Sequence, residues 1–273
     1  MASSGRGAGA PGAQPAQGGL HLVEWACELA GTAILLLGGL SAVCLDFGAH
    51  TPLGSVATSP RLLLTGLLFA GTGSLVAISP LGRRSGAHLN PVVTLAFWTQ
   101  GKVHPHDVAG YIVGQVLGAF VGTALLALIW GQDAYALHLG ATAPGPGVSD
   151  VAAVLIEAAM TATLILAILV MTSSARTARW TPLLLWGLIA VLVWQGAPYT
   201  GTSLNPARSL APAVLAPLLA PYWIYVVGPL LGAGIAVAVF AAFQERQVLT
   251  AKLFHDPAYP STLASALPVA RRG

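Results

Sequence analysis

The sequence predicts an all-α membrane protein with six transmembrane helices and two half-helices, arranged as an inverted 3+3 repeat. Of its 273 residues, 55% are hydrophobic and only 8% are charged, whereas soluble domains carry about 25% charged residues. Six apolar stretches are each close to the ~20 residues that a bilayer requires. Two Asn-Pro boxes recur in similar surroundings, which indicates a duplicated chain.

The predicted elements divide the chain into two halves with a segment at each end. We place the spans at about 22–46, 61–81, 108–130, 151–172, 180–199 and 221–243. Residues 1–19 are a low-complexity stretch that we expect to be a disordered tail, and no clear signal-peptide cleavage site follows it. The expected units are a disordered tail at 1–19, a first half at 20–140, a second, inverted half at 141–247 and a cytoplasmic tail at 248–273.

The two boxes read SGAHLNPVVT at Ser85–Thr94 and TGTSLNPARSL at Thr200–Leu210. Each opens an apolar stretch, 90–99 and 205–217, that is too short to cross a membrane. Proline at the first helical position is favourable because its missing N–H has no helical partner there. Non-helical backbone at membrane depth is tolerated only where it is buried in protein or lines a water-filled cavity. We therefore expect the residues before each box to line such a cavity.

Further landmarks repeat in the same order in both halves. The segment ELAGTA from Glu28 matches EAAMTA from Glu157, and YIVGQVLGA from Tyr111 matches YVVGPLLGA from Tyr225. Three spans in each half is an odd number, so the second half must enter the membrane from the opposite face. Such inverted repeats place their functional site near the midplane.

Glycines at four-residue spacing predict close packing of the third and sixth spans. Small residues at this spacing let helix backbones approach one another, so we interpret these glycines as packing residues and not as a site. They are Gly110, Gly114, Gly118 and Gly122 in the third span and Gly228 and Gly232 in the sixth.

The basic residues indicate an orientation in the membrane. With both termini on one side, ten of the twelve Lys and Arg residues fall on that side, leaving Arg61 and Arg208 on the other. The positive-inside rule then puts both termini in the cytoplasm of a multi-pass cell-membrane protein. The net charge of +3 therefore reflects membrane orientation, and we expect no nucleic-acid partner.

Asn90, Asn205 and Arg208 are the first candidates for a functional site. As N-caps, the two asparagines can hold the start of each half-helix and present their NH2 groups to a passing neutral molecule, although they could also be purely structural caps. Two positive helix ends in a narrow passage repel cations and oppose proton hopping. Arg208 lies one helical turn after Asn205 and would add fixed donors, the alternative being an interfacial arginine that reaches lipid headgroups.

Glu28 and Glu157 occupy matching positions in the two halves. Because a buried carboxylate needs donors, we interpret both as supports for the irregular segments before the boxes. The alternative is a proton relay. His88, two residues before Asn90, is interpreted as a hydrogen-bonded loop residue that also supports its segment, and not as a switch.

No catalytic or cofactor chemistry is indicated. We expect no enzyme activity and no cofactor, because no nucleophile set and no HExxH motif occurs. We also expect no metal: His104, His106 and Asp107 form a short HPHD cluster that would need further ligands, and Asp107 is predicted to be the N-cap of the third span. Cys27 and Cys44 lie in one helix, too far apart for a disulfide.

With its paired boxes, its E-x-x-x-T starts and its G-P-x-x-G-A run at Gly228–Ala233, the chain resembles the aquaporin (major intrinsic protein) family over about residues 22–245. The resemblance implies an aquaporin-like fold, a homotetramer and passive permeation of water or small neutral solutes through each subunit. Within the boxes, the matching positions are Asn90, Pro91 and Val92 in the first half and Asn205, Pro206 and Ala207 in the second.

The resemblance also implies a selectivity filter. Its positions correspond to Arg208 and Thr202, to Val193 on the fifth span, and to Phe69 or Ala70 on the second span. Val92 departs from the usual alanine, and Val193 from the histidine typical of strict water channels. Ser209 departs from the aspartate that glycerol channels usually carry after the arginine.

These departures leave the permeant open, with water favoured and glycerol or another small uncharged solute as the alternative. An ion-coupled secondary transporter is a more remote alternative, because it would need an ionisable residue at a central coupling site.

Overall fold

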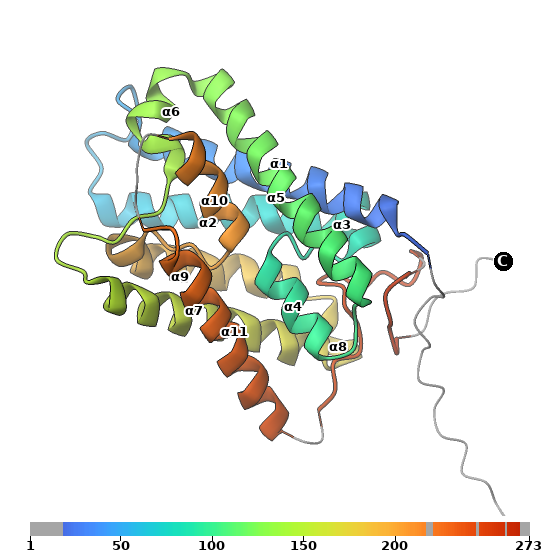
Figure 1. Ribbon diagram of the computed structural model, residues 1–273. Helices are drawn as coiled ribbons and strands as arrows, with labels where there is room; N and C mark the ends of the chain where they lie inside the picture. The colour runs from blue at the N-terminus through green and yellow to red at the C-terminus, as the bar shows by residue number, and fades with distance from the viewer. Residues whose placement is uncertain (1–18, 217–220, 244–245, 260, 268–273) are drawn as a thin grey trace, which may run out of the picture.

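The computed structural model describes residues 19–216, 221–243, 246–259 and 261–267, so the predicted tail at 1–19 lies almost wholly outside the described residues. Regular structure in the described residues is helical throughout, apart from one isolated antiparallel bridge between Thr250 and Ser265. Six helices are long and apolar enough to cross a membrane (Figure 1): α1 (Leu22–Phe47), α2 (Thr58–Ile78), α5 (Pro105–Trp130), α7 (Asp150–Thr172), α9 (Thr181–Thr200) and α11 (Ile224–Ala242). The six predicted spans are therefore confirmed.

Shorter helices connect and fill this bundle. The two half-helices are α4 (Pro91–Thr99) and α10 (Pro206–Leu215), and each begins directly after the asparagine of its box. The remaining short elements in the described part of the chain are α3 (Pro80–Ser85), α6 (Gln132–Ala136), the 3-10 turn η1 (His138–Gly140) and α8 (Ala175–Ala178).

The helix pairs repeat the duplication seen in the sequence. α1 packs along α5, and α7 packs along α11, which are the corresponding helices of the two halves. Each half-helix touches both halves, because α10 contacts α5 and α4 contacts α11. The two half-helices therefore lie in the interior of the bundle (Figure 1) and join one half to the other.

The predicted glycine ladder lies in the closest helix contacts. A Cβ on Gly118 or Gly122 of α5 would meet the backbone carbonyl of Leu29 or Ala33 in α1. Gly232 of α11 faces the backbone of α7 in the same way. These positions let the helix backbones approach one another, as small residues do in membrane bundles.

The two ends of the bundle are distinct. We name the end that carries the start of α1 and the described C-terminal residues the terminal face, and the other end the opposite face. Arg84 and Glu24 form an ion pair of 2.7 Å at the terminal face. At the opposite face, His50 lies 3.3 Å from Asp133.

The C-terminal segment 246–267, in its described residues, is packed onto the terminal face. Val248, Ala251, Leu253 and Leu263 are buried, and the Leu249 N–H donates a hydrogen bond of 2.9 Å to the carbonyl of Thr172 at the end of α7. The predicted cytoplasmic tail at 248–273 is thus, where described, part of the packed structure.

The start of α5 differs from the prediction. Its N-cap is His104, followed by Pro105, and Asp107 is the third helical residue instead of the cap. The Asp107 carboxylate accepts hydrogen bonds from the Trp25 indole (2.8 Å) and the His21 ring (2.7 Å). Asp107 therefore binds α1, a tertiary contact that local sequence does not reveal.

Candidate functional site

Each half-helix is capped by the asparagine of its box. The side-chain oxygen of Asn90 accepts a hydrogen bond of 3.1 Å from the Val92 N–H. The side-chain oxygen of Asn205 accepts bonds from Ala207 (3.0 Å) and Arg208 (3.3 Å). These are the N-cap bonds that a helix start requires, and they fix the rotation of both amide groups.

The two asparagines are joined by a reciprocal pair of hydrogen bonds. The Asn90 NH2 group donates to the Leu204 carbonyl at 2.8 Å, and the Asn205 NH2 group donates to the Leu89 carbonyl, also at 2.8 Å. Each amide has two N–H donors, so one remains on each residue after this bond is made. The starts of α4 and α10 are therefore held against one another inside the protein.

The backbone before each box has the same unusual conformation in both halves. Ala87 and Leu89 have φ of 55° and 52°, and the corresponding residues Thr202 and Leu204 have φ of 51° and 57°. Left-handed backbone is uncommon for residues other than glycine and persists only where the surroundings enforce it. In these segments it turns successive peptide groups away from helical pairing.

The two glutamates satisfy the N–H groups that this conformation leaves free. Glu28 accepts bonds from the N–H groups of His88 (3.0 Å) and Leu89 (2.7 Å). Glu157 accepts bonds from those of Ser203 (2.8 Å) and Leu204 (2.9 Å). Both side chains are fully buried, so each carboxylate holds its segment without competition from solvent.

Two tyrosines, which the sequence marks only as repeated landmarks, complete these supports. The Tyr111 hydroxyl donates to the Ser85 carbonyl at 2.6 Å, and the Tyr225 hydroxyl donates to the Thr200 carbonyl at 2.9 Å. Gln115, which was also missed, donates to Glu28 at 2.8 Å. The recurrence of the tyrosine in both halves was the signal that could have revealed its function.

Two cavities lie along the interior next to these segments. One, of about 110 Å³, is lined by Asn90 and Asn205 and extends to His88 and Leu253 at the terminal face. The other, of about 340 Å³, extends toward the opposite face. They are neighbours, because both are lined by Phe69, Ile189, Ser203, Leu204 and Arg208.

The larger cavity brings together the residues expected at a filter. Phe69, Val193, Thr202 and Arg208 all line it, whereas Ala70 lines only the smaller cavity. The residue Arg208 is 7% exposed, and its guanidinium donates a hydrogen bond of 2.9 Å to the Gly140 carbonyl. This arrangement places one fixed cation in the wall of the cavity.

Other residues of the boxes lie outside the cavity walls. Val92 is fully buried in the hydrophobic core, so its replacement of alanine does not change the lining of either cavity. Three further buried residues also lie outside the lining of both cavities: Pro91, Pro206 and Ala207.

His88 lies where the smaller cavity meets the C-terminal segment. Its Nε2 is 2.7 Å from the Ala251 carbonyl, and its Nδ1 is 3.1 Å from the Thr94 hydroxyl. The Leu253 N–H donates to the Gly86 carbonyl at 2.9 Å. The C-terminal segment therefore bonds to the irregular segment of the first box at the terminal end of this cavity.

Comparison with known proteins agrees with this architecture. The family model described as Major intrinsic protein matches residues 22–240. The chain belongs to the major intrinsic protein family. This is a family of channel proteins.

Individual relatives of this major intrinsic protein are moderately similar. Probable aquaporin AqpM of Archaeoglobus fulgidus is 35% identical over 227 residues, covering 77% of this chain and 92% of the relative. Aquaporin TIP4-4 of Zea mays is 36% identical over 57% of this chain, and the match spans 62% of that relative, less than two thirds of its length. The X-ray structure of the aquaglyceroporin from Plasmodium falciparum shares the fold, with a TM-score of 0.65 at 22% identity, and the match covers 83% of this chain and 96% of that one.

Proposed function

We propose that this protein is a passive channel for water, and for small uncharged solutes to a lesser extent, that excludes ions and protons. The observation that carries the proposal is the reciprocal bonding of Asn90 and Asn205 in the wall of the smaller cavity. Two helix N-termini, each equivalent to about half a positive charge, converge there. The second N–H of each amide is a donor for the oxygen of a permeating molecule.

Ion exclusion follows from the same geometry. Two positive helix ends repel cations, and a water molecule that accepts hydrogen bonds from both amides cannot pass a proton along a chain of waters. Arg208 adds a full positive charge in the larger cavity. The rest of the smaller cavity is lined mainly by apolar side chains, such as Leu164, Ile168 and Leu185, which bind a neutral solute weakly.

The filter consists of Phe69, Val193, Thr202 and Arg208. Phe69 takes the second-span position in preference to Ala70, because it lines the same cavity as the other three. Val193 supports the alternative function, a facilitator of glycerol or another small neutral solute, since an apolar side chain adds no hydrogen-bond requirement there. Ser209 favours water over glycerol as the permeant, because glycerol channels usually carry an aspartate at this position.

The remaining parts of the proposal concern the membrane. The protein acts in the cell membrane as a homotetramer, with both termini in the cytoplasm. The distribution of ten of the twelve basic residues supports this orientation. An ion-coupled transporter is disfavoured because the carboxylates of Glu28 and Glu157 accept hydrogen bonds from backbone N–H groups. Neither glutamate is therefore free to act as the central ion-coupling residue.

Stopped-flow measurements on proteoliposomes test the proposal. An osmotic step of impermeant sugar gives the water permeability, and a glycerol gradient gives the solute permeability. We expect water flux well above that of empty vesicles, independent of any ion gradient, and lower glycerol flux. Arg208→Ala should raise glycerol permeability. Flux that requires an ion gradient, or no flux above empty vesicles, would refute the channel.

A further inference from the structure

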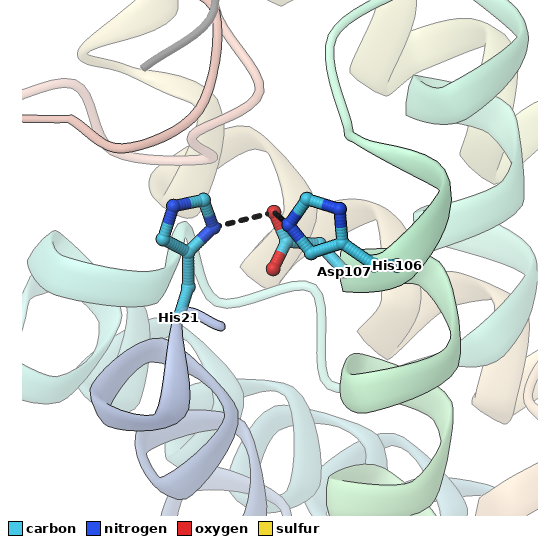
Figure 2. A group of neighbouring side chains, drawn as sticks. All are labelled: His21, His106 and Asp107. Carbon is cyan, nitrogen blue, oxygen red and sulfur yellow. Dashed lines mark hydrogen bonds and ion pairs between the residues drawn. The ribbon is translucent and has the colours of Figure 1, made fainter. Parts of the chain in front are cut away.

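A group of metal-ligating side chains lies at the terminal face, outside the two cavities. His21 precedes α1, and His106 and Asp107 lie in the first turn of α5 (Figure 2). The His21 Nδ1 is 2.7 Å from the Asp107 Oδ2, and the His106 Nε2 is 3.7 Å from the same oxygen. One ligand atom from each of the three residues lies within 4.8 Å of the others.

One of these ligand atoms has no hydrogen-bond partner. The His106 Nε2 is buried and makes no hydrogen bond among the described residues, since the Asp107 Oδ2 at 3.7 Å is too far for one, and the His104 Nε2 also makes none. The rings of His104 and His106 are stacked, with centroids 5.2 Å apart. Burying an unpaired polar atom is costly, and in native structures such an atom calls for an explanation such as a bound ion.

The carboxylate is already oriented for coordination. The Asp107 Oδ1 accepts a hydrogen bond of 2.8 Å from the Trp25 indole, which leaves Oδ2 turned toward the two histidines. Metal-binding carboxylates are commonly held by such a second hydrogen bond. Asp107 is fully buried, whereas His106 is 37% exposed, so an ion can enter from the side of His106.

We propose that His21, His106 and Asp107 bind one transition-metal ion of the Zn²⁺ class. Two imidazoles and a carboxylate suit Zn²⁺, whereas Mg²⁺ and Ca²⁺ prefer oxygen ligands. Tetrahedral Zn²⁺ requires ligand atoms about 3.3 Å apart. The separations of the two histidine nitrogens from the Asp107 Oδ2, 2.7 and 3.7 Å, lie on either side of this value, and all three ligand atoms lie within 4.8 Å of one another.

The proposed ion would join the start of α1 to the start of α5. The partial positive charges of two helix N-termini oppose a cation there, and the full negative charge of Asp107 offsets them. Because the ion binds the folded protein, it should stabilise the contact between these helices.

Calorimetric titration of ZnCl2 into the full-length, tag-free protein tests the site. The protein is first stripped with a chelator and kept in detergent. We expect one Zn²⁺ per chain and a higher thermal unfolding temperature. His106→Ala should weaken binding at least ten-fold, a typical loss when a metal site is perturbed. His50→Ala is the matched control, because His50 lies at the opposite face beside Asp133.

Co²⁺ provides a second measurement that does not depend on a variant. Bound to wild-type protein with a water molecule as the fourth ligand, it should give the intense visible absorption of a four-coordinate site, and Zn²⁺ should displace it. No saturable binding by the wild type, or equal affinity in the wild type and His106→Ala, would overturn the proposal. If metal-free His106→Ala and metal-free wild type have the same thermal unfolding temperature, a loss of metal binding in the variant is not caused by misfolding.

Discussion

The guanidinium of Arg208 lies over the ring of Phe69, with its Cζ 5.6 Å from the ring centroid. A cation over an aromatic face is stabilised by about 0.5–2 kcal/mol, depending on its solvation. Both side chains line the larger cavity, so the contact holds the charge of Arg208 beside the Phe69 ring in the cavity wall.

Phe69→Ala should therefore raise glycerol permeability several-fold, because it widens the passage and frees the arginine. Water permeability should change less, since water already fits. Stopped-flow light scattering on proteoliposomes measures both. Phe243→Ala is the matched control, because Phe243 is exposed at the end of α11. Equal glycerol permeability in Phe69→Ala and the wild type would remove Phe69 from the filter.

Glu157→Gln should destabilise the second irregular segment. The carboxylate accepts bonds from the Thr200 hydroxyl (2.7 Å) and from the N–H groups of Ser203 (2.8 Å) and Leu204 (2.9 Å). Glutamine would turn an NH2 group toward at least one of these donors. Leaving a buried donor unpaired costs about 1–3 kcal/mol. Thermal unfolding in detergent measures the loss, and Asp150→Asn, an exposed change on the same helix, should have a smaller effect. Equal unfolding temperatures of the two variants would contradict the supporting role of Glu157.

Gly118→Ala should lower the stability of the protein, whereas Gly187→Ala should not. A Cβ at Gly118 meets the carbonyl of Leu29, whereas a Cβ at Gly187 has open space around it. Alanine is intrinsically better than glycine in a helix by roughly 0.5–1 kcal/mol, but overpacking a tight contact costs about 1–3 kcal/mol. The unfolding temperature should thus fall for Gly118→Ala and stay level or rise for Gly187→Ala. A rise in both would mean that the α1–α5 contact is looser than the structure indicates.

The spans and boxes could be predicted from sequence because their signals are local. Hydropathy over a window marks a span, and an Asn-Pro pair before an apolar stretch marks the start of a half-helix. Local signals of this kind could not decide whether Phe69 or Ala70 occupies the filter position on the second span. Neighbouring residues on a helix point about 100° apart, so only the rotation of α2 in the bundle decides which one lines the larger cavity.

Contacts between distant segments were also beyond the sequence. Asp107 resembles an N-cap locally, but His21 and Trp25, more than 80 residues earlier, determine its role. The segment around Ala251 and Lys252 follows the last predicted span and holds no apolar stretch long enough to cross a membrane, so the sequence predicts only a tail there. Its burial depends on carbonyl and N–H groups in the first irregular segment, which a residue pattern does not display.

Leu253→Pro should raise water permeability. The Leu253 N–H donates to the Gly86 carbonyl at 2.9 Å, and the Leu253 side chain lines the smaller cavity. Proline removes this donor and so weakens the attachment of the C-terminal segment to the terminal end of the passage. Ala266→Ser, an exposed change in the same segment, should leave permeability unaltered. Unchanged water flux in Leu253→Pro would mean that the segment does not restrict the passage.

Lys252 should make this attachment dependent on pH. Its Nζ donates to the Arg83 carbonyl at 2.7 Å, and the side chain is fully buried. Burial, and to a smaller extent the charge of Arg84, lower the pKa of Lys252, while the charges of Glu24 and Asp256 act in the opposite direction; together they bring the pKa to about 8. When the segment is free, the pKa returns to its usual value of about 10.4.

The packed segment therefore binds fewer protons than the free segment between pH 8 and about 10.4, so raising the pH through this range favours packing. Water permeability should fall as the pH rises from 8 to 10. Lys252→Met retains an apolar stem of similar length and has no proton to lose, so its permeability should respond less to pH over the same range. Stopped-flow traces at matched osmotic steps measure both proteins, and parallel pH profiles would show that Lys252 does not control the attachment.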